Sequence, residues 1–436
     1  MKYIVLPTAT TWAPVPEGSH FPIQNLPFCR FEEPDLGEIH LGVRIGDQLL
    51  SIDSLIEHGF LGEYSDRVFL DIADLANPNE PTALGIGPDL PALPTGLSDL
   101  RRQIAELLDA DNPELRDNAE ATEGAFFDAE TATFEVPTFC SSFVDFYSGI
   151  HHASNVGRMF RPTQPPLLPN YRHVPIAYNG KASTVYVSGT GIVRPKGQYL
   201  LAGADAPVYG ACQELDFELE MGFYISQASV PWQPVQAGEA EEHILGLVLV
   251  NDWSARDLQR WEYQPLGPFL SKSFSTSASP YLVTLDALEP FRTQGMPQDP
   301  APLPHLRTTG AHHFDIQLEV LLQTPAMSRP QVISRSNTKH LYWSMAQQIA
   351  HLTSNGAPLT SGDLCASGTI SGEEEGTFGS LLELTWKGER PLTMEETGET
   401  RTFLEDGDRV ILTGWGEGQG YRVGFGSVEG VVLPAR

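Results

Sequence analysis

Three carboxylates alternate with apolar side chains in residues 215–221, which read LDFELEM. With the two-residue repeat of a strand, Asp216, Glu218 and Glu220 lie on one face and the apolar side chains on the other. One interpretation is a half-buried strand with a hydrated acidic side, as is common in antiparallel sheets. The other is a site for a hard cation, because adjacent like charges are costly without one. The alternation alone leaves both interpretations open.

A second group of polar side chains follows an apolar run that is typical of a buried strand, and it reads NDWSARDLQRWEY. A helix that begins near Ser254 would place Arg256, Gln259 and Tyr263 on one face, with Asp252 at the end of the strand. A guanidinium, an amide and a phenol that gather at the end of a strand indicate a binding site. The alternative is an amphipathic helix with an exposed Asp–Arg pair, which contributes about 0.5 kcal/mol.

Asp145 and His152 stand seven residues apart in DFYSGIHH. Seven residues are two helical turns, so we expect that both side chains can share one helix face. Because single histidines are usually structural and a His-His doublet is a weak zinc signal, this spacing alone does not assign a function.

Short alternating or β-branched runs, separated by Gly, Pro, Ser and Asn, fill the chain from about residue 139 onward: 184–189, 215–225, 244–250, 314–322 and 409–413. Their spacing favours a mostly antiparallel β architecture. One predicted helix interrupts them and ends at Asn355-Gly356. Its apolar face consists of Leu341, Met345, Ile349 and Leu352.

Residues 1–138 have a different sequence pattern and are predicted to form a separate, small β-rich unit. The pattern of residues 41–50, with a turn at Gly46-Asp47, predicts a hairpin. A Pro/Gly-rich loop is expected over residues 78–94. Ser98 is then expected to cap a helix whose apolar face consists of Leu100, Ile104, Leu107 and Leu108.

The composition describes an acidic chain with a sizeable core. Its 436 residues are 41% apolar, and 27 basic against 56 acidic residues give a formal net charge of −29. Such a field repels nucleic acid and anionic membranes. An anionic substrate would therefore need a local cluster of Arg and Lys.

Targeting signals are not apparent, because the N-terminus lacks a secretory pattern and no apolar run reaches the roughly 18 residues of a spanning helix. We therefore expect a soluble, intracellular protein. Four cysteines, far apart and without a zinc-type spacing, are expected to be buried thiols rather than disulfides.

Several long motifs occur in order along the chain: FPIQNLPFCRF, LGVRIGDQLLSID, SFVDFYSGIHHASNVGRMFRP, LPNYRHVPIAYNGKASTVYVSGT, ELDFELEMGFYI, NDWSARDLQRWEYQPLGPFLSKSFSTSASPY, ASGTISG through FGSLLELTWKG, and VLPA. Together they resemble the fumarylacetoacetase family over essentially the whole chain. The resemblance implies a mostly β, α+β fold. Residues 1–138 would form an SH3-like β-barrel, and residues 139–436 a larger mixed β-sandwich or β-roll catalytic domain. It also implies a cytoplasmic homodimer.

The resemblance implies roles for individual residues by their position in the motifs. The divalent-metal ligands would be Asp145, Glu218, Glu220 and Asp252. Lys272 and Thr276 would lie near a second magnesium ion, which Asp252 would also bind. The catalytic base would be His152, with Glu383 as its orienting carboxylate. The substrate contacts would be Tyr147, Arg161, Tyr178, Arg256, Gln259, Tyr263 and Thr369. One departure is Ile150-His151, where the family pattern has Arg-Gln.

The implied reaction is hydrolysis of 4-fumarylacetoacetate to fumarate and acetoacetate, the last step of tyrosine and phenylalanine breakdown, with Ca²⁺ or Mg²⁺ as cofactor. A β-diketone accepts the electrons of the broken C–C bond as an enolate, and a hard cation suits both keto oxygens. His152 would take a proton from water. Arg256, Gln259 and Lys272 would stabilise the oxyanion, and Arg161 and the tyrosines would hold the substrate's carboxylates.

Two alternatives stay open, one with the same fold and one from a different functional class. Another enzyme of the same fold, such as an acylpyruvate hydrolase or an enol-keto isomerase, is less favoured because the chain keeps the N-terminal unit and the WEYQPLGPF segment. A catalytically silent metal-binding or interaction protein would have no need of His152, Glu383, Arg256, Gln259 and Lys272 together. The all-oxygen ligand set does not distinguish Ca²⁺ from Mg²⁺ or Mn²⁺.

Overall fold

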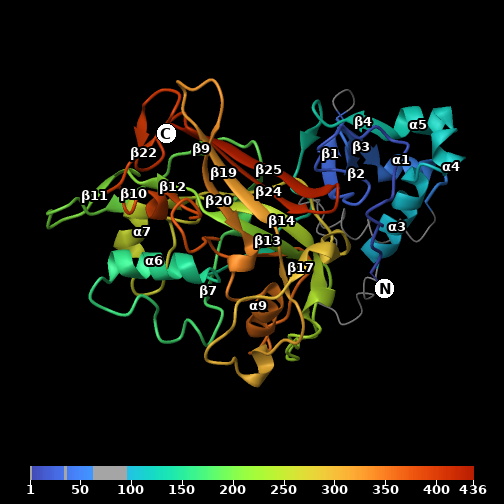
Figure 1. The fold of residues 1–436 in the computed structure, drawn as a ribbon. Helices are drawn as coiled ribbons and strands as arrows, with labels where there is room; N and C mark the ends of the chain where they lie inside the picture. The colour runs from blue at the N-terminus through green and yellow to red at the C-terminus, as the bar shows by residue number, and fades with distance from the viewer. Residues whose placement is uncertain (1, 34–36, 62–95) are drawn as a thin grey trace.

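The computed structural model describes residues 2–33, 37–61 and 96–436, so the predicted Pro/Gly-rich loop lies outside the described residues. Figure 1 shows an N-terminal unit beside a larger unit that holds the rest of the chain. The predicted α+β fold, with a small N-terminal unit and a larger C-terminal one, is confirmed. Among the described residues, no helix is long and apolar enough to span a membrane.

The N-terminal unit contains a five-stranded antiparallel sheet in the order β4-β3-β2-β1-β5. Its strands are β1 (Phe28–Glu32), β2 (Ile39–Ile45), β3 (Gln48–Ser51), β4 (Phe126–Asp128) and β5 (Thr133–Phe134). Its helices are α1 (Ile52–Glu57), α3 (Gly96–Leu108), α4 (Pro113–Arg116) and α5 (Ala119–Ala125). The predicted hairpin is β2–β3. The apolar face predicted for α3 is buried, but Ser98 lies inside this helix rather than at its cap.

Two larger sheets form the rest of the molecule. The first has seven strands in the order β7-β6-β21-β13-β14-β16-β8, with bounds Ala177–Asn179, Ser142–Phe146, Asp363–Ala366, Leu219–Ile225, Ile244–Asp252, Thr276–Ala278 and Val185–Val187. The second has five strands in the order β20-β19-β24-β25-β9, with bounds Gln331–Asn337, Gln317–Gln323, Arg409–Glu417, Arg422–Leu433 and Ile192–Val193. Most pairs are antiparallel, as predicted, but β6–β21, β8–β16 and β9–β25 are parallel.

Short strands and helices join these sheets. The two-stranded pairs are β10 (Lys196–Tyr199) with β11 (Val208–Ala211), β12 (Leu215–Asp216) with β15 (Ser254–Ala255), β17 (Arg292–Thr293) with β18 (His313–Phe314), and β22 (Leu392–Thr393) with β23 (Thr400–Arg401). The helices are α6 (Ile150–Phe160), α7 (Arg256–Glu262), α8 (Leu285–Leu288), α9 (Met345–Leu352) and α10 (Leu381–Leu384). Single 3₁₀ turns are η1 (Ala182–Thr184), η2 (Ala240–His243), η3 (Glu289–Phe291), η4 (Pro304–Leu306) and η5 (Thr338–His340).

The predicted C-terminal helix is α9, which Ser344 begins with a capping box. Leu341 precedes the helix, and Gly356, with a φ of +89°, follows its end. Of the four cysteines, which are all free, three are buried and Cys140 is half-buried, so the expectation of unpaired thiols is confirmed.

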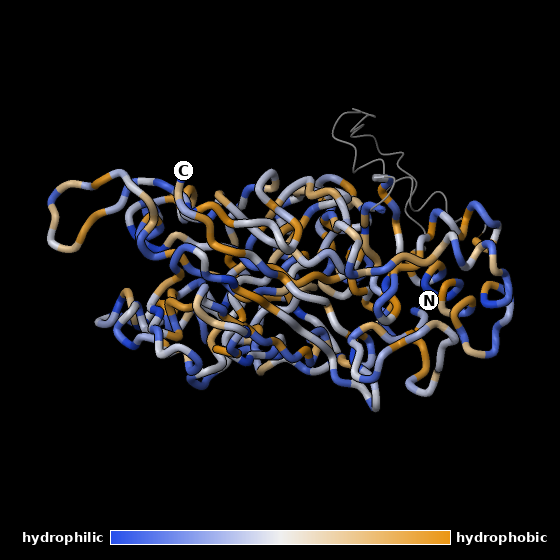
Figure 2. Tube along the Cα trace, turned by 90° about the horizontal axis from the view of Figure 1, so that it is seen from above, coloured by the Kyte–Doolittle hydropathy of each residue, from blue (hydrophilic) through white to orange (hydrophobic). Residues whose placement is uncertain are grey.

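Both faces of the seven-stranded sheet are covered. One face packs on the five-stranded sheet through the largest apolar cluster, to which Phe223 and Leu249 contribute. The other face contributes Tyr224 and Val248 to a second cluster that includes α1, α3 and the hairpin of the N-terminal unit. The hydropathy colouring in Figure 2 shows apolar segments running through the interior of both units. The central strands are therefore buried on both sides.

Candidate active site

Four carboxylates from different elements of the large unit lie together. Oxygen atoms of Asp145, Glu218, Glu220 and Asp252 all lie within 4.8 Å of one another. Asp145 ends β6, Glu220 stands in β13 and Asp252 ends β14. Directly paired residues share a sheet face and alternate residues along a strand return to it, so the registers put these three on one face. Glu218 joins from the irregular step between β12 and β13.

The acidic segment 215–221 is therefore not the hydrated side of a half-buried strand, and that interpretation is wrong. All its residues are buried, because both sheet faces are covered. Its first carboxylate also has a different environment from the other two. Asp216 accepts hydrogen bonds from Arg256 Nε at 2.8 Å and from the backbone N–H groups of Leu381 and Leu382 at the start of α10.

Glu218 is compensated by cationic side chains. Lys272 Nζ forms a short contact with its carboxylate, and Arg256 Nη1 lies 2.8 Å from Glu218 Oε1. Burial alone would raise the pKa of Glu218, but the nearby Lys272 and Arg256 hold it well below its ordinary value. This side of the cluster therefore stays ionised.

Asp145 and Glu220 lack such compensation: within the described parts of the chain, no cation forms a salt bridge with either. Burial and the neighbouring carboxylates raise the pKa of both groups. Asp145 Oδ1 and Glu220 Oε1 are buried, and neither has a hydrogen-bond partner among the residues that the structure describes. Hard divalent cations bind carboxylate oxygens. The two free oxygens and the uncompensated charge therefore fit such an ion.

Asp252 is held by side chains from three neighbouring segments. Tyr178 donates to its Oδ2 at 2.7 Å, Lys272 Nζ to the same oxygen at 2.9 Å, and Thr276 to its Oδ1 at 2.8 Å. Thr276 stands directly opposite Asp252 in the β14–β16 register. Tyr178 is opposite Asp145 in β6–β7. The register of the sheet thus brings the predicted metal and substrate residues together here.

The structure positions His152 differently from the prediction. Asp145 is in a strand and His152 is in α6, which Gly149 caps, so the two residues do not share a helix face. His152 is buried, and its Nδ1 lies 2.6 Å from Glu383 Oε2. Since a carboxylate only accepts hydrogen bonds, Nδ1 carries the proton and Nε2 is left as a base.

Glu383 is held in place by several donors that the sequence reasoning missed. Asn155 Nδ2 donates to Oε1 at 2.9 Å, while Ser371 and Ser380 donate to Oε2 at 2.8 and 3.0 Å. Burial alone would raise the pKa of Glu383, but His152 and these hydrogen bonds lower it. The signal for Ser380 was readable, because Ser-x-x-Glu is a helix-start pattern and Ser380 caps α10.

Arg256 and Gln259 come from α7, which begins at Arg256; Ser254 belongs to a short strand instead of starting the helix. Arg256 Nη1 donates to Gln259 Oε1 at 3.2 Å, and its Nη2 is buried without a partner. Tyr263 lies past the helix end and is 42% exposed. Its hydroxyl accepts a hydrogen bond from Gln264, and the role of Tyr263 as a substrate contact stays a prediction.

The remaining predicted substrate residues lie on or next to α6, which carries His152. The ring of Tyr147 meets the His152 ring edge-on, with centroids 5.4 Å apart. Thr369 is buried and its hydroxyl has no partner. Arg161 ends α6; its Nη2 donates to Pro166 O, and its buried Nε is unpaired. Among the described residues, Thr369 and Arg161 therefore each carry a buried donor that no other group uses.

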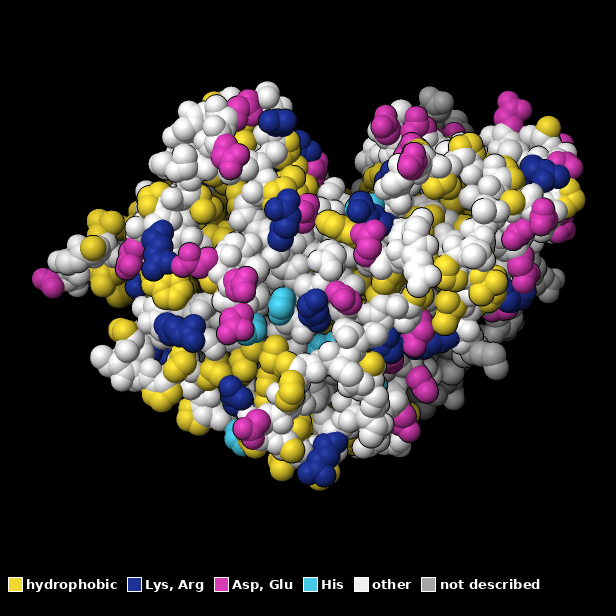
Figure 3. Space-filling model, in the orientation of Figure 1, with side chains coloured by type: hydrophobic (Ala, Val, Ile, Leu, Met, Phe, Trp, Pro, Cys, Tyr) yellow, Lys and Arg dark blue, Asp and Glu magenta, His cyan; other side chains and the backbone are white. Residues whose placement is uncertain are grey.

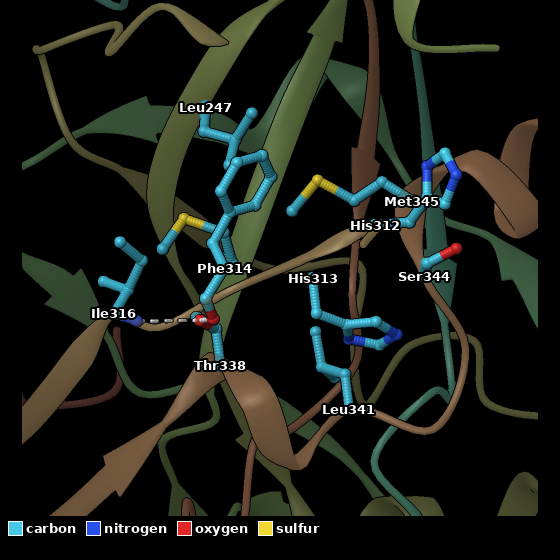
Figure 4. Close-up of a pocket in the computed structure, with 10 residues that line it drawn as sticks. Leu247, His312, His313, Phe314, Ile316, Thr338, Leu341, Ser344 and Met345 are labelled. Atoms are coloured by element: carbon cyan, nitrogen blue, oxygen red, sulfur yellow. Dashed lines mark hydrogen bonds between the residues drawn. The ribbon is translucent and has the colours of Figure 1, made fainter. Parts of the chain in front are cut away.

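Two hollows in the described structure lie away from this site. Figure 4 shows a small cavity between Leu247, Phe314 and Met345, on the opposite face of β13 and β14 from the carboxylates. The other is a groove between the two units, lined by Arg44, Tyr281 and Glu429. Neither contains a member of the carboxylate cluster.

Comparisons with known proteins agree along the whole chain. A model of the fumarylacetoacetase N-terminal domain matches residues 24–137, and one of the fumarylacetoacetate (FAA) hydrolase C-terminal domain matches residues 142–432. The chain is 47% identical to the Mus musculus fumarylacetoacetase over 428 residues, covering 98% of this chain and 99% of that one. It is 44% identical to the Arabidopsis thaliana fumarylacetoacetase, covering 96% of each.

Solved structures resemble the fold at lower sequence identity. A crystal structure of Cg1458 with inhibitor matches with a TM-score of 0.50 and 14% identity, covering 94% of this chain and 100% of that one. At this identity the likeness concerns the fold alone.

Proposed function

The chain belongs to the fumarylacetoacetase family of hydrolases that act on carbon–carbon bonds, and we propose that its four-carboxylate cluster binds the divalent cation for this reaction. The substrate is 4-fumarylacetoacetate and the products are fumarate and acetoacetate, in tyrosine and phenylalanine breakdown. The observation that carries the proposal is the combination of two arrangements: the carboxylate cluster with its uncompensated pair Asp145–Glu220, and the His152–Glu383 pair, whose imidazole acts electrostatically on Glu218 of the cluster.

The cation is assigned to Asp145, Glu218, Glu220 and Asp252, whose oxygen donors suit Ca²⁺ or Mg²⁺. When bound, it acts as a Lewis acid on the keto oxygens of the substrate. Lys272 and Thr276 adjoin Asp252 and are the proposed neighbours of a second magnesium.

His152 is the proposed general base. Its Nε2 takes a proton from water, while Glu383 holds Nδ1–H and stabilises the imidazolium that forms. The hydroxide adds to the carbonyl carbon beside the fumaryl group. Arg256, Gln259 and Lys272 donate to the resulting oxyanion, and Arg256 Nη2 is a donor not used elsewhere.

Collapse of this intermediate breaks the bond between the attacked carbonyl carbon and the neighbouring carbon. The electron pair leaves as the enolate of acetoacetate, and His152 returns its proton to that carbon. Tyr147, Arg161, Tyr178, Tyr263 and Thr369 are the proposed contacts to the rest of the substrate. The aromatic and cationic side chains that line the proposed site let it bind an anionic substrate, although the net charge of the chain is −29.

The direct test is incubation with fumarylacetoacetate, with release of free fumarate as the readout. We expect release with Ca²⁺ or Mg²⁺ present and none after exhaustive chelation, with recovery on adding the ion back. Glu218→Gln and Asp252→Asn should weaken cation affinity. Full turnover by the chelated protein would refute the metal assignment, and a cation-loaded protein that releases no fumarate would refute the substrate.

An isomerase of the same fold remains the second candidate, since it would also bind an enolate beside the cation. The donor set of Arg256, Gln259 and Lys272 disfavours it, because proton transfer alone needs no site for a tetrahedral oxyanion. We further propose that the protein is a cytoplasmic homodimer without nucleic-acid or membrane partners, and that residues 1–138 and 139–436 are its two domains.

A further inference from the structure

The two oxygens of the Glu383 carboxylate are held unequally. Oε2 accepts three hydrogen bonds, from His152 Nδ1, Ser371 and Ser380. Oε1 accepts one from the described residues, which Asn155 Nδ2 donates at 2.9 Å. A carboxylate that is anchored at one oxygen can still turn about that oxygen. Because an N–H donor prefers to lie near the plane of the group that accepts it, the bond from Asn155 sets the plane that His152 meets.

Helix α6 brings Asn155 to Glu383 together with His152. The two residues are three positions apart, so their side chains lie on one face of the helix. Glu383 stands in α10, which packs against α6 and shares a small apolar cluster with it through Met159 and Leu382. Asn155 is buried, although asparagine is a poorer helix former than alanine or leucine. Its hydrogen bonds, rather than its packing, therefore explain an asparagine at this position.

Arg158 determines which way the amide of Asn155 points. An asparagine side chain has a donating end and an accepting end of nearly the same shape. Arg158 Nη1 donates to Asn155 Oδ1 at 3.0 Å, and a guanidinium can only donate. A flipped amide would place two donors together at Arg158 and two acceptors together at Glu383. The arginine therefore keeps Asn155 Nδ2 directed at the carboxylate.

These hydrogen bonds connect the surface with the buried imidazole. Arg158 is exposed, whereas Asn155, Glu383 and His152 are buried. Figure 3 shows basic side chains at the surface in the region that α6 occupies in Figure 1. Water can replace the guanidinium at the exposed end but not the amide at the buried end. We therefore expect the loss of Asn155 to have the larger effect.

We propose that Asn155 and Arg158 are positioning residues, which keep the Glu383 carboxylate in the plane that the Nδ1–H group of His152 requires. This inference rests on the proposed function and deepens it, because it adds the residues that orient the partner of the base. Without Asn155, Glu383 Oε1 would be a buried, charged oxygen that lacks a donor, which is costly. The carboxylate would turn, the bond to Nδ1–H would weaken, and Nε2 would lose its fixed direction.

The positioning role is tested without substrate, by the proton NMR signal of His152 Nδ1–H in the Mg²⁺-loaded protein. A proton shared between an imidazole and a carboxylate gives a separate downfield signal, which His152→Ala identifies by removing it. Asn155→Leu keeps a similar side-chain shape but has no donor, and it should move this signal upfield or abolish it. Arg158→Met, a change at the surface, should move it in the same direction by less.

The matched control is Asn337→Leu. Asn337 is 4% exposed against 6% for Asn155, and its Nδ2 donates to a different carboxylate, Asp315 Oδ1, at 2.6 Å. This variant should keep the wild-type signal, and circular dichroism should verify the fold of every variant. A wild type without the signal, an unchanged signal in Asn155→Leu, or an equal loss in the control would overturn the proposal.

The consequence for turnover is measured by steady-state kinetics with fumarylacetoacetate. Asn155→Leu should lower kcat about 10- to 100-fold, and Arg158→Met about 3- to 10-fold. KM should stay within a few-fold of the wild type in both, because the base is misplaced while the substrate contacts remain. A raised KM with wild-type kcat in Asn155→Leu would contradict the positioning role. Because the NMR measurement uses no substrate, it decides that role even if the wild type releases no fumarate.

Discussion

His151 and His152 are neighbours in the sequence but occupy different surroundings. His152 is buried and bonded to Glu383, whereas the half-buried His151 ring lies 5.9 Å from the ring of His340. Burial lowers the pKa of His151, so it is neutral near pH 7, and no carboxylate of the described residues is hydrogen-bonded to it. Only His152 therefore combines an oriented ring with a free Nε2 beside the carboxylate cluster.

We predict that His152→Ala lowers kcat at least ~100-fold, because the general base is lost. His151→Ala should leave kcat within a few-fold of the wild type. Steady-state kinetics, with circular dichroism to verify folding, measure both. A larger loss for His151→Ala than for His152→Ala would reverse the assignment.

Glu383 provides a second residue-scale prediction. A glutamine at this position keeps one acceptor oxygen but presents an NH₂ group to His152 or to the donors around it. That change disfavours the Nδ1–H tautomer, so Glu383→Gln should lower kcat at least ~100-fold. KM should change far less, because both oxygens of the buried Glu383 already accept hydrogen bonds from protein side chains. Loss of substrate affinity with kcat unchanged would contradict the orienting role.

The sequence indicated individual site residues better than it indicated their partners. The alternation in residues 215–221 placed carboxylates together, but it could not separate Asp216 from the other two. That separation depends on Arg256 and on the N-terminus of α10, more than 160 residues away in the chain. Contacts of this kind are set by packing, and no local periodicity encodes them.

At the scale of elements, the ends of the strands position the site. The strand β6 ends at Phe146 and the glycine-capped helix α6 follows, so Asp145 and His152 are positioned by different elements. The helix predicted near Ser254 begins two residues later, at Arg256, and ends at Glu262, so Tyr263 is its C-cap. Sequence patterns predicted a helix in both places but not the strand that carries Asp145, and the exact ends of the elements decided which side chains meet.

Gly368 follows β21 and holds Glu220 through its backbone. Its N–H donates to Glu220 Oε2 at 3.0 Å. Its φ is +77°, and a Cβ there would lie 2.2 Å from Phe146 O. A side chain at this position is therefore both strained and blocked by backbone that cannot rotate away.

We predict that Gly368→Ala weakens divalent-cation affinity by at least ~10-fold, since Glu220 loses its fixed position. The control is Gly420→Ala in the β24–β25 turn, where φ is +83° but nothing lies within 4 Å of the added Cβ. Calorimetric titration with Ca²⁺ or Mg²⁺ measures both variants. Equal affinities for the two would mean that Gly368 plays no part in the cation site.

At the scale of the whole molecule, ion pairs connect distant segments near the N-terminus. Glu241 bonds to Arg292 at 2.9 Å and to His312 Nδ1 at 3.0 Å, and Lys2 bonds to the adjacent Glu289 at 2.7 Å. Burial alone would raise the pKa of Glu241, but its hydrogen bonds with His312 and Arg292 lower it to about 2. The hydrogen bond to Glu241 raises the pKa of His312.

These shifts predict how the network contributes to stability at different pH. Glu241 stabilises the fold above its ordinary pKa of 4.5, and this contribution is lost as the pH falls toward about 2. His312 stabilises it below its ordinary pKa of 6.5, and this contribution is lost as the pH rises through the raised value. The wild type should therefore exceed Glu241→Gln in Tm most between pH 4.5 and 6.5. A Tm difference that does not vary with pH would contradict this account.

The central claim is that the large unit activates water to cut a carbon–carbon bond, which distinguishes it from an isomerase that only moves protons. The most direct measurement is turnover of fumarylacetoacetate by the cation-loaded protein in ¹⁸O-labelled water, followed by mass spectrometry of the products. Our account predicts one ¹⁸O atom in the newly formed carboxylate of fumarate, because hydroxide adds to the carbonyl beside the fumaryl group. Rearranged but uncleaved diketone as the sole product would contradict it.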